Sequence, residues 1–139
     1  MSNKLTVEII TPDKSILNSE ANEVTIPSYE GQMGILKDHI PLITFLRPGV
    51  ISIQNQHEKK YFVEEGTVEF SNNNLLILTS TAKDLKELNR NSIEEILSQA
   101  EKKLSDNNFS DKEKYLLSYK IDTLKAVSYT HLRAHETRI

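Results

Sequence analysis

The chain has 139 residues, enough for one ordinary domain or for one small domain with an appendage. Hydrophobic residues make up 37% of it and charged residues 27%, which is typical of a globular protein with a modest core. The net charge of −3 argues against nucleic acid as the main partner, because phosphate binding needs a positive surface. Cysteine is absent, which excludes disulfides, thiolate metal sites and cysteine nucleophiles. No run approaches the roughly 18 apolar residues of a membrane-spanning helix.

The pattern of residues 1–84 predicts a series of short β-strands. Apolar and polar side chains alternate from Leu5 to Ile9, around Thr25 and over 67–70, and mostly apolar runs lie at 50–53, 61–63 and 75–79. Alternation of period two with β-branched enrichment marks half-buried strands. Turn signals separate the runs, at 12–13, 30–31, 48–49, 65–66 and 71–74. Many short strands at this spacing predict a β-sandwich or a barrel.

Residues 85–127 predict a pair of helices instead. All four Gly and all four Pro lie before residue 82, and their absence beyond it permits long helices. Ser92 and Ser110 each have a Glu three residues later, the capping-box pattern of a helix start, and apolar residues recur behind both at helical spacing. A polar run at 105–108 lies between the two patterns. Two amphipathic helices joined by a short polar loop predict an antiparallel hairpin.

Residues 128–139 break this pattern, because they carry neither a helix cap nor a clear apolar stripe. The run resembles translated adapter sequence, so we expect a non-native or disordered tail, with a frayed natural terminus as the alternative. His131 and His135 lie in this tail at a metal-compatible spacing, but no third ligand accompanies them. The sequence therefore predicts no metal site.

Asp38 and His39 form the most catalytic-looking pair in the chain. A general base needs an orienting group and a nucleophile or substrate within reach, and residues adjacent in sequence rarely meet that geometry. We therefore expect a turn histidine that hydrogen-bonds to local backbone. The rival reading, an enzyme, predicts a concave pocket with a third polar group near His39.

Two surface features each allow two interpretations. The segment 30–34 holds two glycines but lacks the following Lys-Ser/Thr of a phosphate-binding loop, so it is either a plain turn or an exposed binding loop. Lys112, Lys114 and Lys120 contribute to a charged outer face of the predicted hairpin. That face serves either solvation or attraction to an acidic partner.

Three short motifs follow one another within residues 24–53. A G-x-x-G-I-L run occupies 31–36, an H-x-P-L-x-T run occupies 39–44, and a P-G pair follows at 48–49. In this order they resemble the signature of the epsilon subunit of the F-type ATP synthase. A second stretch, 61–70 followed by 75–82, resembles the second sheet motif of that family. The resemblance covers residues 4–125, including the order of strands followed by a hairpin.

The resemblance implies a fold and a function. The fold is a β-sandwich of ten strands over residues 1–84, followed by an antiparallel two-helix hairpin over residues 85–127. The function is that of a rotor subunit in the central stalk, which couples the gamma subunit to the ring of c subunits and restrains ATP hydrolysis through its hairpin. Such a subunit performs no chemistry of its own. It lies peripherally on the cytoplasmic face of the bacterial inner membrane and contacts the alpha/beta catalytic hexamer through the hairpin.

The resemblance also implies site residues. The contact loop for the c-ring and gamma would comprise Ser28, Glu30, Gly31, Gln32, Gly34 and His39, and the regulatory hairpin would act through Lys112, Lys114 and Lys120. Some bacterial members bind ATP through an I/L-D-x-x-R-A motif, which matches residues 88–93 here. Asn89 replaces the acid of that motif and Ser92 replaces its arginine, so we expect no ATP binding and no cofactor. Ser92 is expected to cap the first helix instead.

An alternative of a different class is a free-standing β-sandwich binding module that dimerises through its helical hairpin. It predicts a stable homodimer in isolation, whereas the stalk subunit is expected to be a monomer that awaits gamma.

Overall fold

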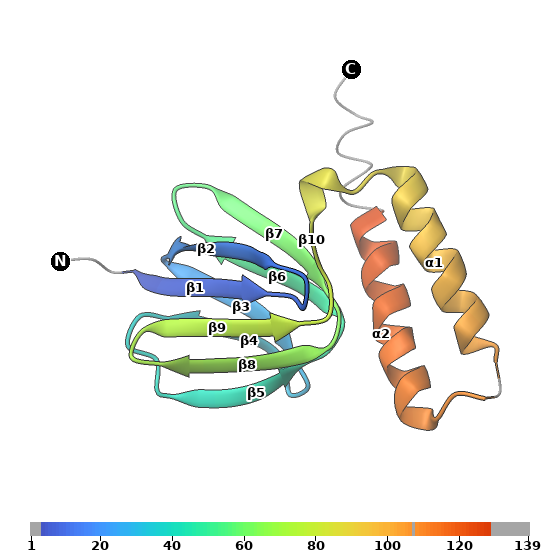
Figure 1. Cartoon of the computed structure of the whole chain (residues 1–139), viewed down its shortest axis with the longest axis horizontal. Helices are drawn as coiled ribbons and strands as arrows, with labels where there is room; N and C mark the ends of the chain where they lie inside the picture. The colour runs from blue at the N-terminus through green and yellow to red at the C-terminus, as the bar shows by residue number, and fades with distance from the viewer. Residues whose placement is uncertain (1–3, 107, 129–139) are drawn as a thin grey trace, which may run out of the picture. The chain divides into compact units, whose positions relative to one another are not determined.

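The computed structural model describes residues 4–106 and 108–128, which fall into two compact units divided between Asp84 and Leu85. Apart from Ser128, the tail predicted to be non-native lies outside the described residues. The first unit consists of ten β-strands and the second of two helices (Figure 1). This agrees with the predicted fold class.

The strands follow one another at short intervals. They are β1 (Leu5–Ile10), β2 (Ser15–Ala21), β3 (Glu23–Ser28), β4 (Gly31–Leu36), β5 (Leu42–Leu46), β6 (Gly49–Gln54), β7 (Glu58–Val63), β8 (Gly66–Ser71), β9 (Asn74–Thr79) and β10 (Ala82–Asp84). The pattern predicted β1, β3, β6, β7, β8 and β9. It missed β2 and β5, and also β4, which contains two glycines, and β10, which has only three residues. Glycine weakens a strand by itself, so β4 depends on its pairing with β3.

The strands form two layers of five. One layer has the order β2-β1-β9-β8-β5 and the other β10-β7-β6-β3-β4, and the pair Ser28 and Leu46 joins β3 of one layer to β5 of the other. Figure 1 shows the first layer in front of the second. All pairings among these strands are antiparallel except that of β1 with β9. The parallel pairing of β1 with β9 joins the first strand of the unit to one of its last strands.

Alternate side chains of these strands fill the space between the layers. In β1, Leu5, Val7 and Ile9 are buried while the residues between them are not, and β6 repeats this alternation. Full burial of a large aliphatic side chain stabilises a fold by roughly 1.5–3 kcal/mol. The core therefore follows from the period of two seen in the sequence.

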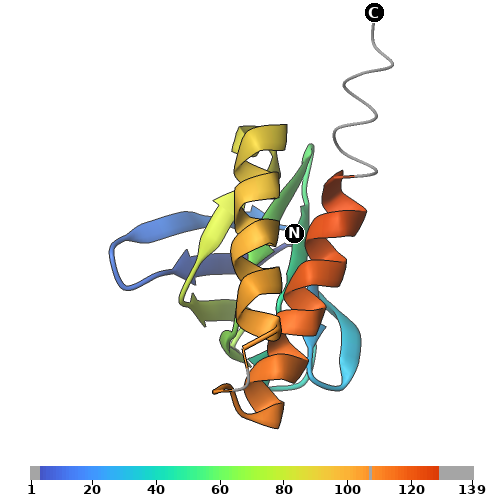
Figure 2. The same ribbon diagram turned by 90° about the vertical axis from the view of Figure 1, so that its right-hand side faces the viewer.

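The second unit starts with a short 3-10 turn, Leu85–Glu87, and contains α1 (Arg90–Leu104) and α2 (Asp111–Val127). The two helices run antiparallel and lie side by side in both views (Figures 1 and 2). The Nζ of Lys125 lies 4.0 Å from the Oε1 of Glu101 on the other helix. Both side chains are more than half exposed, so this ion pair adds little stability.

One predicted helix cap is confirmed and the other is wrong. The Ser110 side chain accepts a hydrogen bond from the Glu113 backbone N–H, as the capping pattern predicts. In α1, however, Ser92 lies inside the helix and donates its own backbone N–H to the Asn89 side-chain oxygen over 2.8 Å. Asparagine caps a helix as well as serine does, so α1 begins three residues earlier than predicted. No helix among the described residues is long and apolar enough to span a membrane.

Candidate functional site

The predicted contact loop is mostly a tight β-hairpin. Tyr29 and Glu30 form a two-residue turn between β3 and β4, and Gln32 and Gly34 belong to β4 itself. The expectation of an exposed loop over 28–34 is therefore corrected to a hairpin tip with one regular strand behind it. The pairing of β4 with β3 decides this, since it supplies backbone hydrogen bonds that a loop would lack.

Buried hydrogen bonds hold the tip in shape. The Ser28 hydroxyl is fully buried, donates to the Gly31 carbonyl over 2.7 Å and accepts from the Glu30 N–H. Gly31 has φ = +120°, a conformation that side-chain-bearing residues rarely adopt. Ser28 and Gly31 therefore shape the tip, whereas Glu30 is exposed on it.

His39 lies apart from this tip. It belongs to the loop between β4 and β5, at the far end of β4 from Gly31. The two ends of this six-residue strand are five steps of about 3.3 Å apart, which is roughly 17 Å. The structure thus places the residues of the predicted contact loop in two groups and does not bring His39 to the tip.

The His39 ring makes local contacts. Its Nδ1 lies 2.7 Å from the Ile40 carbonyl oxygen, and the ring meets the Phe70 ring edge-on with centroids 6.0 Å apart. The prediction of a turn histidine bonded to local backbone is confirmed. Within residues 4–106 and 108–128, no group of three His, Asp or Glu residues could hold a metal ion, and His131 and His135 lie outside that part.

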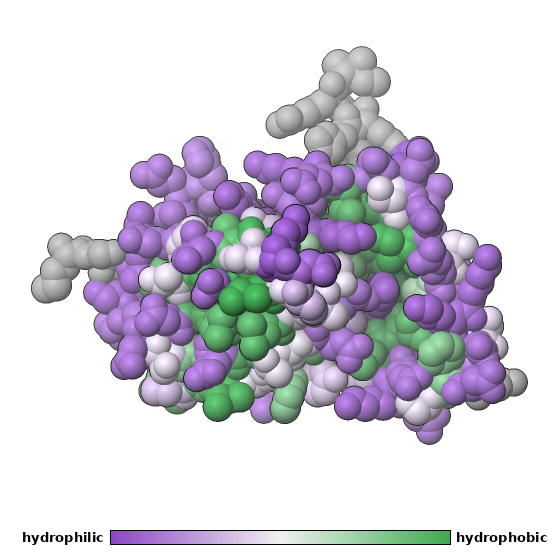
Figure 3. All heavy atoms as spheres, in the orientation of Figure 1, coloured by the Kyte–Doolittle hydropathy of each residue, from purple (hydrophilic) through white to green (hydrophobic). Residues whose placement is uncertain are grey.

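The outer face of the first layer carries an apolar row that the sequence analysis missed. Phe45 on β5, Thr67 on β8, Leu78 on β9 and Ile10 on β1 are register partners, so they form one row across the outer face of the first layer. Phe45 is 58% exposed and Leu78 43%, and Ile43, the next outward residue of β5, is 78% exposed. Figure 3 shows a green area over this part of the sandwich.

Tyr29 extends this row to the hairpin tip. Its backbone N–H donates to the Phe45 carbonyl over 3.2 Å, and the two rings lie 6.3 Å apart. At the other end of the row, Ile10, Thr67 and Leu78 help to line a shallow groove of about 450 Å³. We call the set Tyr29, Ile43, Phe45, Leu78 and Ile10 the apolar face.

The sequence does contain a signal for this face. The run Leu42–Leu46 is apolar at four of its five positions. A strand of an antiparallel sheet with one solvated face normally has polar residues at its outward positions. Ile43 and Phe45 break that rule, and large apolar patches on a protein surface mark interaction sites.

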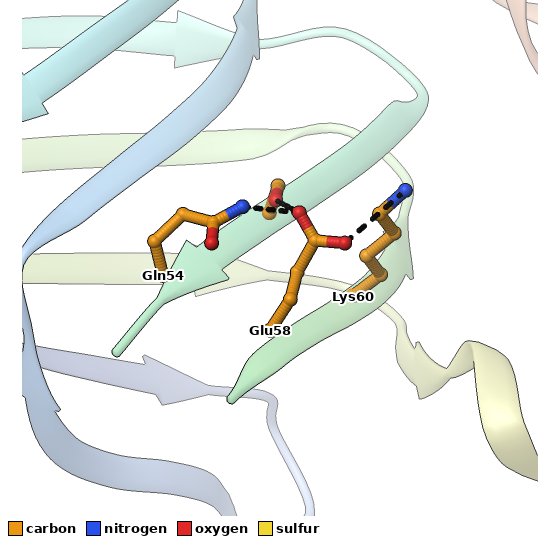
Figure 4. A network of polar contacts seen from close by, with 4 residues as sticks. Gln54, Glu58 and Lys60 are labelled. Carbon is orange, nitrogen blue, oxygen red and sulfur yellow. Dashed lines mark hydrogen bonds and ion pairs between the residues drawn. The ribbon is translucent and has the colours of Figure 1, made fainter. Parts of the chain in front are cut away.

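A polar ladder crosses β6 and β7 (Figure 4). Glu58 accepts hydrogen bonds from Ser52 and from Gln54, and its Oε1 lies 3.6 Å from the Lys60 Nζ. The hydrogen bond from Ser52, outweighing the opposing effect of burial, lowers the pKa of Glu58 with help from Lys60. The group is exposed, so we interpret the ladder as support for the strand pair rather than as a site.

The structure places the predicted hairpin residues as follows. Lys112 is exposed on the first turn of α2, and Lys114 and Lys120 are half-buried further along it. At the start of α1 the Asn89 carboxamide is engaged as the helix cap.

Comparisons with known proteins agree with this architecture. The family model described as "ATP synthase, Delta/Epsilon chain, beta-sandwich domain" matches residues 4–84. The ATP synthase epsilon chain of Pelagibacter ubique is 46% identical over 130 residues, which are 92% of this chain and 100% of that protein. The epsilon chain of Parvibaculum lavamentivorans is 30% identical over 94% of this chain and 99% of its own length.

Two solved structures share the fold. A chain of the Euglena gracilis mitochondrial ATP synthase, in a structure titled OSCP/F1/c-ring, superposes with a TM-score of 0.73 at 18% identity, covering 94% of this chain and 83% of that one. A chain of the Tetrahymena thermophila mitochondrial ATP synthase, titled central stalk/c-ring, gives a TM-score of 0.65 at 20% identity, covering 92% of this chain and 96% of that one. The family match over the β-sandwich, together with relatives of 30% and 46% identity over nearly the whole chain, shows that the chain belongs to the ATP synthase delta/epsilon family, as an epsilon chain.

Proposed function

We propose that the chain is a rotor subunit in the central stalk of an F-type ATP synthase, where its β-sandwich joins gamma to the c-ring. Family membership supports this role, and the apolar face is the observation that carries it. A row of exposed apolar side chains that includes two aromatic rings is costly to leave in water. Aromatic residues are also the commonest anchors of protein interfaces. We assign this face to gamma.

The hairpin tip suits a different partner. Glu30 and Gln32 are exposed and polar, which fits the polar loops of c subunits better than an apolar surface. His39 lies at the other end of β4, so it cannot share one small contact with the tip. We therefore assign Glu30 and Gln32 of the tip to the c-ring, and we leave Tyr29 and His39 to the gamma side.

The test is purification of the tagged full chain together with its own gamma subunit. We expect a stable complex with gamma and a monomeric chain when gamma is absent. A stable homodimer that does not bind gamma would instead support the binding module that dimerises through its hairpin.

An F-type ATP synthase works at a membrane, and this chain would belong to its central stalk. We therefore propose a peripheral location on the cytoplasmic face of the bacterial inner membrane.

We propose further that the subunit is non-catalytic and restrains ATP hydrolysis through its hairpin, presenting Lys112, Lys114 and Lys120 to the alpha/beta hexamer. In the complete enzyme, deleting residues 90–139 should leave assembly intact and raise ATP hydrolysis by about fivefold or more, a coupling at the low end of allosteric effects. Hydrolysis rates of wild-type and truncated complexes provide the measurement. Deleting only residues 129–139, beyond the end of α2, is the control and should change nothing. Equal rates in all three complexes would make the hairpin purely structural.

ATP binding by the subunit itself is not expected. A triphosphate needs cationic, bidentate donors, and the motif's arginine position holds Ser92, inside α1. The motif's acid position holds Asn89, whose side chain already caps the helix. Calorimetric titration of the full chain with ATP at low-millimolar concentration should show no binding. A saturable isotherm in the micromolar range would overturn this assignment.

A further inference from the structure

The loop between β4 and β5 is tied to the turn between β8 and β9 by one side chain. The Asn73 side-chain oxygen accepts the Asp38 backbone N–H over 2.7 Å. The amide nitrogen of the same side chain donates to the Asp38 carboxylate over 3.2 Å. Asp38 and Asn73 are 35 positions apart in sequence, so this two-point contact, which we call the clamp, joins segments that only the fold brings together.

The clamp holds a backbone conformation that the loop would otherwise avoid. Asp38 has φ = 67°, in the left-handed region that is unfavourable for residues with side chains. Such residues persist where their surroundings over-determine them. Asn73 contributes to this constraint because it binds both the backbone and the side chain of Asp38. It acts beside the hydrogen bond that the His39 N–H donates to the Leu36 carbonyl over 3.1 Å.

The part of the loop that follows the clamp carries surface groups. Ile40 is 75% exposed, and the His39 ring rests edge-on against Phe70 while its Nδ1 meets the Ile40 carbonyl. Two residues further on, β5 begins, which carries Ile43 and Phe45 of the apolar face. Fixing Asp38 therefore also fixes the segment that carries Ile40 and that precedes the surface we assign to gamma.

We propose that Asn73 is a positioning residue for this surface: through the clamp it holds the β4–β5 loop in the arrangement that gamma binds. The proposal rests on the proposed function. Its physical basis is that a loop ordered before binding loses less conformational freedom on association than a mobile one. Asn73 itself need not touch the partner.

The turn offers a matched pair of variants. Asn72 and Asn73 both have positive φ, 51° and 59°, as the central residues of a two-residue type I′ hairpin turn. Glycine suits both positions, so Asn73→Gly removes the clamp without straining the turn. Asn72→Gly makes the same change where no side-chain contact to Asp38 is lost. The exchange Asp38→Asn with Asn73→Asp restores the pairing with the roles of the two groups reversed.

Two measurements on the full chain test the proposal. In Asn73→Gly the Asp38 amide should exchange with solvent about tenfold faster, because its acceptor is gone. Affinity for purified gamma should fall about fivefold, a change that corresponds to the net contribution of one hydrogen bond. The denaturation midpoint should stay close to that of wild type. Asn72→Gly should match wild type in all three measurements, and the exchanged pair should recover both exchange protection and affinity.

The outcomes separate this proposal from the proposed function. Unchanged amide exchange in Asn73→Gly would show that the clamp does not hold the loop. Faster exchange together with wild-type affinity would show that gamma binding does not depend on the order of the loop. Either result overturns the positioning role while gamma binding by the wild-type chain stands. Failure of the wild-type chain to bind gamma would remove the proposed function first.

Discussion

Gly66→Ala is expected to destabilise the β-sandwich by about 3 kcal/mol or more, at the upper end of what overpacking costs. A Cβ at Gly66 would lie 2.1 Å from the Leu78 carbonyl oxygen and 2.8 Å from the Thr79 Cα. Both obstacles are backbone atoms of β9, with which β8 pairs at this position. Gly66 also pairs with Leu46 of β5, so β8 is held on both sides and cannot shift away. Chemical denaturation followed by circular dichroism measures the change.

Gly34→Ala is the matched control for this prediction. Gly34 lies in β4, has a negative φ, and a Cβ there would meet only the Glu23 carboxylate oxygen at an ordinary 3.6 Å. We expect a change within about 0.5 kcal/mol, as for most exposed positions. Similar small losses in both variants would mean that β8 and β9 separate more easily than their pairing indicates.

Phe45→Glu is expected to weaken gamma binding by about 30-fold, since truncating an aromatic anchor typically costs 2 kcal/mol or more of binding energy. The substitution places a charge in the middle of the apolar face, between Tyr29 and Leu78. Burying an unpaired carboxylate against gamma is unfavourable, so the charged variant should bind more weakly than a mere truncation. Because Phe45 is 58% exposed in the chain alone, the fold itself should tolerate the change. Titration of purified gamma against the full chain measures the affinity.

Gln56→Glu adds the same charge elsewhere and serves as the control. Gln56 is exposed in the turn between β6 and β7, in the other layer of the sandwich. The affinity of the Gln56→Glu variant for gamma should match that of wild type. If Phe45→Glu also binds gamma normally, the apolar face must serve a different partner or none.

Much of the fold could be predicted from local pattern. Strands such as β1 and β6 alternate strictly between residues that are buried and residues that are not, and this period of two is visible without any structure. The hairpin was predictable because Gly and Pro are absent beyond residue 82 and because Ser110 has a helix-start pattern behind it. Family motifs at 31–36 and 39–44 identified the family, and the comparisons confirm that identification.

The candidate site was less predictable, because it depends on pairing between distant strands. The motif residues Gln32 and His39 look like neighbours in one loop, but Gln32 lies near the start of β4 and His39 lies beyond its end, so the strand places them apart. Asn89 and Ser92 are both good helix caps, and only the helix register decides between them.

By itself, the sequence determined which residues are apolar, at what period they recur, and which motifs they form. Those properties decide the two-part architecture and the family, because burial and turn formation depend on local residue type. Only the tertiary structure decided that Phe45, Leu78 and Ile10 share one outer row, and that Asn73 reaches Asp38. Register between strands that are far apart in the sequence is a collective result of packing. For that reason the surfaces offered to partners emerge from the fold rather than from any single stretch of the chain.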